Sequence, residues 1–229
     1  MAVLKGSVIG ELSGKLGNLA ARCTGGRTVL GRRPVSFTVN YSPTMVEIRK
    51  KFAVSVSFVK NMLSLAALAT IWDKVKVSGM TVYNYGVKQN YNPSSAEKPT
   101  VGNILTPAGG FALPVTLAAV AEDSVTATID PLDTVMIPAD EERDFVVNGL
   151  ICYYNPVNPE DAPYAITAIK QAPDSLDTVN PIALNIPLNV VQQNLGAKYQ
   201  SSILYLALAT IDGDGKIVQY SSTYAKDSQ

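Results

Sequence analysis

The spacing of apolar residues changes along the chain, and residues 42–75 have the spacing of a helix. Their apolar positions recur at steps of three and four, which places them on one helix face: Met45, Ile48, Phe52, Val56, Val59 and Leu63. Ser42-Pro43 precedes this run, and proline is favoured in a first helical turn. Ser78-Gly79 ends it, and a second short helix is expected at residues 80–88. The pattern predicts a helical segment over residues 42–88.

The pattern of residues 115–229 is that of β-strands. Short runs rich in β-branched residues are separated by turn clusters, at residues 125–129, 134–137, 144–154, 164–170, 182–186, 202–211 and 216–224. Asp212-Gly213-Asp214-Gly215 joins the last two runs, and Asp-Gly is typical of a hairpin turn. This spacing predicts an antiparallel, immunoglobulin-like β-sandwich domain at residues 115–229.

Glycine sets the first segment apart, because residues 1–41 hold seven of the sixteen glycines. Each glycine costs a helix about 1 kcal/mol relative to alanine, so turns and extended pieces are favoured there. The segment has few side chains to bury and is predicted to be an extended basic arm lying along another surface. Residues 89–114 are rich in Pro and Gly and are interpreted as a connector. The fold class expected is α+β, mainly β.

The amino-acid composition limits the chemical functions that the chain can perform. The chain has 229 residues, two cysteines and no histidine. The commonest metal ligand and the usual neutral-pH general base are therefore missing, and two cysteines alone do not make a zinc site. We expect no enzyme activity, no metal and no cofactor. Charged residues interrupt the apolar positions near the N-terminus, and the apolar stretch at residues 61–72 is shorter than the ~20 residues of a membrane span, so neither a secretory signal nor a membrane is expected.

The balanced charge conceals a gradient. The chain has 19 basic and 19 acidic residues, but residues 1–60 contain ten Lys/Arg against two Asp/Glu. Residues 111–229 contain five Lys/Arg against fifteen Asp/Glu. Such a distribution favours head-to-tail contact between copies, or an arm that binds an acidic partner. A single folded chain whose basic face and acidic face neutralise each other would have the same numbers of charged residues.

Three short motifs resemble functional sites and fail on spacing. Residues 10–16 (GELSGKL) have three residues between the glycines where a phosphate-binding loop has four, and Leu16 follows the lysine in place of Ser or Thr. The turn at Asp212 lacks the glutamate of a calcium loop, since Thr223 occupies the twelfth position. The run at residues 140–144 (DEERD) is consecutive, which is typical of a solvated loop rather than of an acid–base pair in a cleft.

The charged clusters are instead candidate subunit-interface residues. Arginine can grip carboxylates or phosphates with two parallel hydrogen bonds, and the acidic run offers a docking surface for a basic arm. The predicted interface residues are Lys15, Arg22, Arg27, Arg32 and Arg33 on one side and Asp140, Glu141 and Glu142 on the other. A solvated edge for the arginines and a solvated loop for the carboxylates are the simpler alternatives.

Both ends of the chain resemble a family of proteins encoded in Bacteroidota genomes and their phages. Residues 10–18 (GELSGKLGN) match its G-x-x-S-G-K-x-G-N opening, and a basic β segment follows at residues 26–34. The helix carries the Arg-x-x-Phe pattern at residues 49–52, and the D-G-K turn at 214–216 precedes SSTY at 221–224. The middle of the chain is unmatched, and residues 44–47 depart from the family's glutamine-rich stretch. The family is similar to the ring proteins of the neck and tail of crAss-like phages.

The resemblance implies a structural virion protein: a repeated subunit of a multimeric ring in the neck or tail of a bacteriophage, assembled in the host cytoplasm. Its expected partners are copies of itself and other virion proteins such as portal or tail components. Two alternatives stay open, a bacterial surface or adhesion module and a nucleic-acid-binding protein that uses the basic arm. Few aromatic residues accompany the arm's basic ones, which disfavours a stacking platform for bases.

Overall fold

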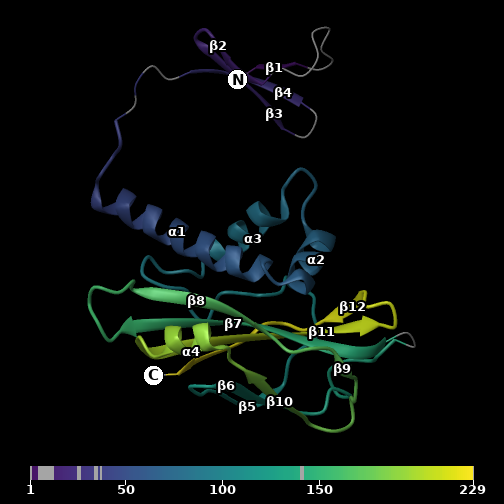
Figure 1. Cartoon of the computed structure of the whole chain (residues 1–229). Helices are drawn as coiled ribbons and strands as arrows, with labels where there is room; N and C mark the ends of the chain where they lie inside the picture. Colours follow the sequence, from purple (N-terminus) through teal and green to yellow (C-terminus); the bar gives the residue numbers. More distant parts are fainter. Residues whose placement is uncertain are drawn as a thin grey trace. The chain divides into compact units, whose positions relative to one another are not determined.

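The computed structural model describes residues 2–4, 13–24, 27–33, 36, 38–139 and 142–228. The chain divides into two compact units, Met1–Met45 and Val46–Gln229, each with its own secondary structure (Figure 1). Within the described residues the chain is mainly β with antiparallel sheets and four helices, in agreement with the fold class expected from the sequence.

The first unit holds a four-stranded antiparallel sheet in the order β1-β4-β3-β2. Its strands are β1 (Ala2–Leu4), β2 (Gly14–Leu16), β3 (Leu19–Thr24) and β4 (Arg27–Arg32). Gly17 and Asn18 connect β2 to β3 in a two-residue hairpin turn, and Gly17 has a φ of 56°, which glycine adopts at little cost. The sequence predicted an extended arm here. Strand pairing instead satisfies the backbone hydrogen bonds that an isolated arm would leave to water.

Three helices come next, α1 (Pro43–Leu63), α2 (Ala66–Val75) and α3 (Val82–Tyr91). The start at Pro43 is as predicted, but the single helix expected at 42–75 breaks at Ser64 and Leu65, where backbone bonds to Asn61 and Met62 close a turn. Thr81 caps α3 by accepting a hydrogen bond from the Asn84 amide.

The predicted apolar face of α1 is wrong in its first half. Ile48 and Phe52 are 42% and 52% exposed, whereas the residues that α1 buries are Val54, Ser55, Phe58, Val59 and Met62. Ser55 is tolerated in this face because its hydroxyl donates to the Lys51 carbonyl one turn back.

A six-stranded antiparallel sheet forms the centre of the second unit. Its long strands β7 (Glu142–Pro156) and β11 (Tyr199–Asp212) pair along almost their whole length. β8 (Tyr164–Lys170) and β9 (Asp174–Ser175) pair with β7, while β12 (Ile217–Tyr220) and β13 (Tyr224–Ser228) pair with β11. The predicted hairpin of β11 and β12 is confirmed, with Asp212 accepting hydrogen bonds from the amides of Asp214 and Lys216 in its turn.

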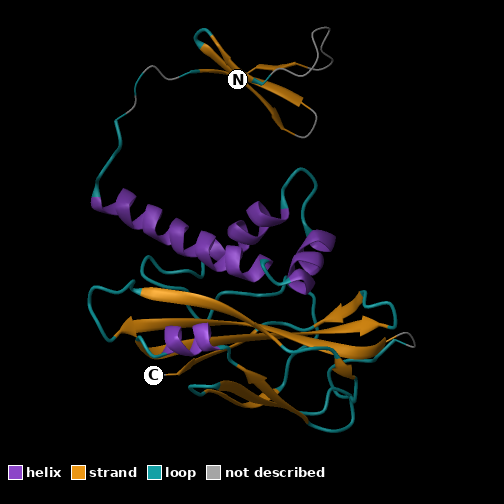
Figure 2. Cartoon of the chain, in the orientation of Figure 1, coloured by secondary structure: helices purple, strands orange, loops and turns teal. Residues whose placement is uncertain are grey.

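A three-stranded sheet in the order β10-β6-β5 lies on one face of the central sheet (Figure 2). It consists of β5 (Val115–Val120), β6 (Ser124–Ile129) and β10 (Ile182–Pro187). The strand expected at residues 134–137 is wrong, because those residues belong to a turn in which Met136 donates to the Leu132 carbonyl. The short helix α4 (Val190–Gly196), β5 and β13 were not predicted. The immunoglobulin-like class stays a prediction.

Helices α1 to α3 cover the opposite face of the central sheet, so this unit has three layers and two hydrophobic cores (Figure 1). Alternate residues of each long strand enter different cores. Leu150 of β7 and Tyr205 of β11 contact the helices, whereas Ile151 and Leu206 contact the small sheet. Trp72 of α2 is fully buried in the helix-side core, and its indole Nε1 donates to the Leu105 carbonyl at 2.7 Å.

The predicted connector at 89–114 is held by buried polar contacts. The Asn103 amide donates to the side chains of Asn90 and Ser94, and Asn90 in turn donates to the Ile104 carbonyl. Leu105 is fully buried and its amide donates to the Thr223 hydroxyl. The helices, this segment and the sheets therefore belong to one unit rather than to separate domains.

Candidate functional site

The basic residues predicted for the subunit interface are all exposed on the N-terminal sheet, and they divide between its faces. Arg22 pairs across the strands with Val29, Lys15 with Ala20, and Thr24 with Arg27. Because side chains alternate along each strand, Lys15, Arg22 and Arg27 share one face, and Arg32 lies on the other. Arg33 follows β4, and its amide donates to the Asn18 carbonyl at 2.8 Å. The sheet thus presents three cations on one surface.

The acidic half of the predicted interface is only partly described, since Asp140 and Glu141 lie outside the described residues. Glu142 is 8% exposed, and both of its carboxylate oxygens are used inside the unit. One accepts from the Thr210 hydroxyl at 2.7 Å, and the other accepts from the Ala139 amide at 3.0 Å. Glu142 therefore joins β7 to β11 and to the backbone of Ala139, and it is not a solvated docking carboxylate.

The two outer layers of the second unit carry opposite charge. The helix layer, residues 46–91, contains seven Lys/Arg and two Asp/Glu. Its basic residues are Arg49, Lys50, Lys51, Lys60, Lys74, Lys76 and Lys88. The three-stranded layer, residues 114–139 and 176–189, contains five Asp/Glu and no Lys/Arg. The charge gradient of the sequence thus places a basic layer on one side of the central sheet and an acidic layer on the other.

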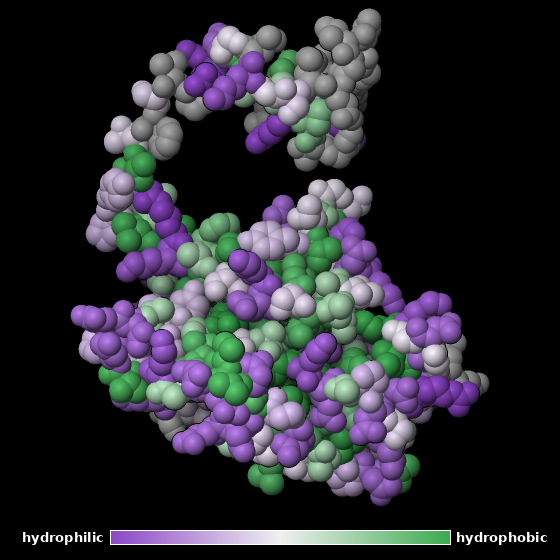
Figure 3. Space-filling view, in the orientation of Figure 1, coloured by the Kyte–Doolittle hydropathy of each residue, from purple (hydrophilic) through white to green (hydrophobic). Residues whose placement is uncertain are grey.

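Apolar side chains accompany the positive charge on the helix layer. Phe52 of α1 and Tyr83 of α3 are both partly exposed and line a shallow depression of about 600 Å³ with Val87 and Tyr91. On the face shown in Figure 3, hydrophobic residues of the second unit reach the surface among hydrophilic ones. Exposed aromatic rings are enriched at protein–protein contacts, whereas lysine, which supplies most of the cations of this layer, is depleted there.

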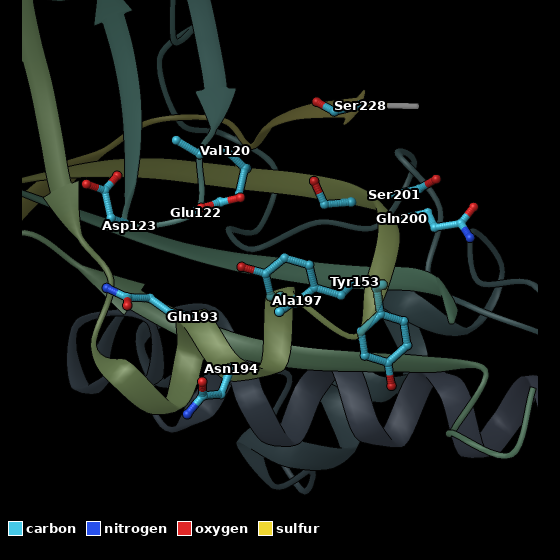
Figure 4. Close-up of a pocket in the computed structure, with 14 residues that line it drawn as sticks. Val120, Glu122, Asp123, Tyr153, Gln193, Asn194, Ala197, Gln200, Ser201 and Ser228 are labelled. Carbon is cyan, nitrogen blue, oxygen red and sulfur yellow. The ribbon is translucent and has the colours of Figure 1, made fainter. Parts of the chain in front are cut away.

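A second hollow, of about 730 Å³, is lined by both polar and apolar residues and lies between α4 and the turn that joins β5 to β6 (Figure 4). Tyr153 of β7 reaches it from the central sheet, and Tyr199 at the start of β11 lines it too. No feature of the sequence indicated this site. Its lining comes from four separated segments of ordinary polar composition, so no local motif could have indicated it.

The remaining reactive groups do not form a metal-binding cluster in the described part of the chain. No three Asp, Glu or Cys side chains there are placed to hold a metal ion. Cys152 is fully buried in the central sheet, and this burial raises the pKa of its thiol to about 12. The thiolate, which is the nucleophilic form, is therefore suppressed at neutral pH. That the chain has no enzyme activity stays a prediction.

In the described residues, no single helix is both long enough and apolar enough to cross a membrane; α1 and α2, bent by 110° from each other, meet that test of length and composition only as a pair.

Comparison with known proteins assigns no family. No protein-family model matches the chain, and no curated protein matches it. Among solved structures, the chain is similar to a β-glucosidase from Kluyveromyces marxianus in complex with glucose, at 15% identity over 52% of this chain and a TM-score of 0.20. A second structure of that enzyme matches at 13% identity over 60% of this chain, with a TM-score of 0.21. The matched parts span 14% and 16% of the enzyme's own length.

Proposed function

We propose that this protein is a structural subunit that assembles head to tail with copies of itself. The observation that carries the proposal is the opposite charge of the two outer layers of the second unit, with seven Lys/Arg in the helix layer and no Lys/Arg in the three-stranded layer. Complementary potentials on different faces favour heterologous contacts, in which one surface of a copy meets another surface of the next. Such contacts close into a ring when the rotation between copies allows it.

The sequence resemblance suggests where such an assembly would occur. It implies a ring in the neck or tail of a bacteriophage, where portal or tail proteins would be the neighbours. In this proposal the central sheet and the three-stranded sheet, with the core between them, form the immunoglobulin-like sandwich of the subunit. The cationic face of the N-terminal sheet is then a further contact to an acidic surface of a neighbouring copy.

A charge-reversal experiment tests the head-to-tail contact. Lys50→Glu with Lys60→Glu lowers the net charge of the helix layer from +5 to +1, and Asp130→Lys with Asp133→Lys raises that of the three-stranded layer from −5 to −1. We expect either pair of substitutions to reduce the native mass of the purified chain at low salt, and the two pairs together to reduce it further, because neither layer then keeps an appreciable net charge. Asp214→Lys in the exposed β11–β12 turn is the matched control and is expected to change nothing. A chain that stays monomeric at all salt concentrations contradicts the proposal, and so does a mass that charge reversal does not change.

Removal of residues 1–41 tests the contribution of the N-terminal sheet. We expect smaller assemblies after the truncation, measured by native mass spectrometry. Salt-dependent binding of double-stranded DNA by the full chain, lost on Arg22→Ala with Arg27→Ala, would instead support the nucleic-acid alternative.

A further inference from the structure

The hollow beside α4 is lined by a buried tyrosine whose hydroxyl has no hydrogen-bond partner among the described residues. Tyr153 is 5% exposed, and its ring lines the hollow from β7. No described side chain or backbone group forms a hydrogen bond with its hydroxyl. By contrast, Tyr205 on the other face of the same sheet donates to the Thr100 carbonyl at 2.8 Å. Because the Tyr153 ring is buried while its hydroxyl makes no hydrogen bond within the described residues, a ligand in the hollow can complete that hydrogen bond.

The surroundings of Tyr153 keep it rigid and neutral. Its ring stacks on the ring of Tyr199 with centroids 6.3 Å apart, and the Tyr199 hydroxyl is anchored to the Ala162 carbonyl at 3.1 Å. Gly196, the last residue of α4, lies against the Tyr153 ring, where an added Cβ would come within 3.2 Å of the ring and of its oxygen. Burial raises the pKa of Tyr153, so the hydroxyl keeps its proton at neutral pH and can donate.

The other polar groups of the hollow define the chemistry of the ligand. Glu122 and Asp123 lie in the β5–β6 turn, and Asn194 and Gln200 contribute amides from α4 and from β11 (Figure 4). One oxygen of Asp123 accepts from the Ser124 hydroxyl at 2.8 Å, which leaves the other available. Lys and Arg are absent from the lining, all of which is described, so nothing there neutralises an anion. Carboxylate acceptors, amides that both donate and accept, and aromatic rings match a neutral ligand rich in hydroxyl groups.

The size of the hollow fits such a ligand. Its volume of about 730 Å³ lies within the range of roughly 300–1,000 Å³ that small-molecule sites occupy. We propose that this cavity binds a neutral saccharide, with the Tyr153 hydroxyl and the carboxylates of Glu122 and Asp123 hydrogen-bonding its hydroxyl groups. Glu122 and Asp123 also belong to the acidic three-stranded layer, but the residues substituted to test this proposal are separate from those of the charge-reversal experiment.

Calorimetric titration of the full chain with neutral trisaccharides tests this inference. Maltotriose, cellotriose, chitotriose and mannotriose are the probes, and sialyllactose is the anionic comparison. We expect at least one neutral trisaccharide to bind, and sialyllactose to bind more weakly than that trisaccharide. Tyr153→Phe removes only the unpaired hydroxyl and is expected to weaken binding about tenfold.

Two further variants keep the test independent of folding. Tyr205→Phe removes a hydroxyl on the helix-facing side of the sheet and is expected to leave the affinity unchanged. Asn194→Ala changes an exposed residue of α4 and is expected to weaken binding without changing the melting temperature. The proposal is overturned if none of the four neutral sugars binds, if only the anionic sugar binds, or if Tyr153→Phe and Asn194→Ala bind as tightly as the original chain. The native mass of these variants is expected to stay unchanged.

Discussion

The N-terminal sheet and the central sheet are both antiparallel, but they bury very different amounts of side chain. In β4, the described residues include one buried side chain, that of Thr28, whereas β11 is buried continuously from Ser202 to Ile211. The central sheet is covered by helices on one face and by a second sheet on the other, and both cores depend on it. A sheet covered on both faces is stabilised by packing, and a thinly covered sheet keeps its side chains available for contact.

The largest expected difference between the two sheets comes from removing the same side chain in each. Leu206→Ala empties a fully buried position of β11 and is expected to lower the free energy of unfolding by about 2–5 kcal/mol. Leu30→Ala in β4, which is only partly buried, is expected to cost under about 1 kcal/mol. Urea unfolding measures both. Equal costs would show that the N-terminal sheet has a packed core of its own.

Two glycines, one in the central sheet and one in the N-terminal sheet, test the same difference in packing with a smaller expected loss of stability. An added Cβ at Gly149 in β7 would lie 2.6 Å from the Tyr205 carbonyl oxygen and 2.9 Å from a Leu206 methyl group. Gly149→Ala is therefore expected to cost about 1–3 kcal/mol through overpacking. At Gly31 in β4 the same methyl group meets nothing within 4 Å, so Gly31→Ala is expected to leave stability nearly unchanged. Thermal unfolding of the two variants checks this, and a stable Gly149→Ala chain would contradict the tight pairing of β7 with β11.

Alkaline pH is expected to destabilise the central sheet. Burial raises the pKa of Cys152 from 9.0 to about 12, so in the folded chain the thiol keeps its proton where the unfolded chain loses it. The unfolded state then binds fewer protons, and stability is full below pH 9 and falls as the pH rises from about 9 toward 12. The expected loss from this group is about 1 kcal/mol at pH 10, one unit above the unfolded pKa. Urea unfolding at pH 8 and pH 10 should show the loss, and Cys152→Ala should reduce it.

The smallest effect is expected from deleting the first unit. Every buried residue of the two cores lies between Phe58 and Ile217. A chain that lacks residues 1–41 is therefore expected to unfold with the same free energy as the full chain, within about 1 kcal/mol. Far-ultraviolet circular dichroism during urea unfolding measures it. A large loss would mean that the N-terminal sheet contributes to the stability of the second unit.

Much of the secondary structure could be predicted from the sequence, because it depends on short-range patterns. The strands at 124–129, 164–170 and 182–187 follow from β-branched runs bounded by turn residues, and the start of α1 follows from proline in the first turn. The β11–β12 hairpin follows from its Asp-Gly turn. The prediction of the buried face of α1 failed because two neighbouring helix faces have similar apolar spacing. Ile48 and Phe52 continue the apolar spacing of α1, yet the sheet covers the stripe through Phe58 and Met62 instead.

The candidate sites were less accessible to sequence reasoning. The charge gradient indicated two oppositely charged surfaces, but the sequence could not show that they lie on opposite sides of one sheet. Glu142 belongs to a run of carboxylates that is typical of a solvated loop, and only the pairing of β7 with β11 placed Thr210 within hydrogen-bond distance of it. The cavity at Tyr153 needed the tertiary structure entirely.

The sequence by itself determined the start of α1, most of the strands after residue 123 and the β11–β12 turn, since these depend on neighbours a few residues away. It also determined the charge of each layer, because each layer consists of nearly continuous segments. The tertiary structure decided which side chains share a surface, because strand pairing joins residues far apart in the chain. The unbroken apolar run of β11 shows the physical reason: it is compatible with burial on either face, and only the layers packed against it decide that Tyr205 meets the helices and Leu206 the small sheet.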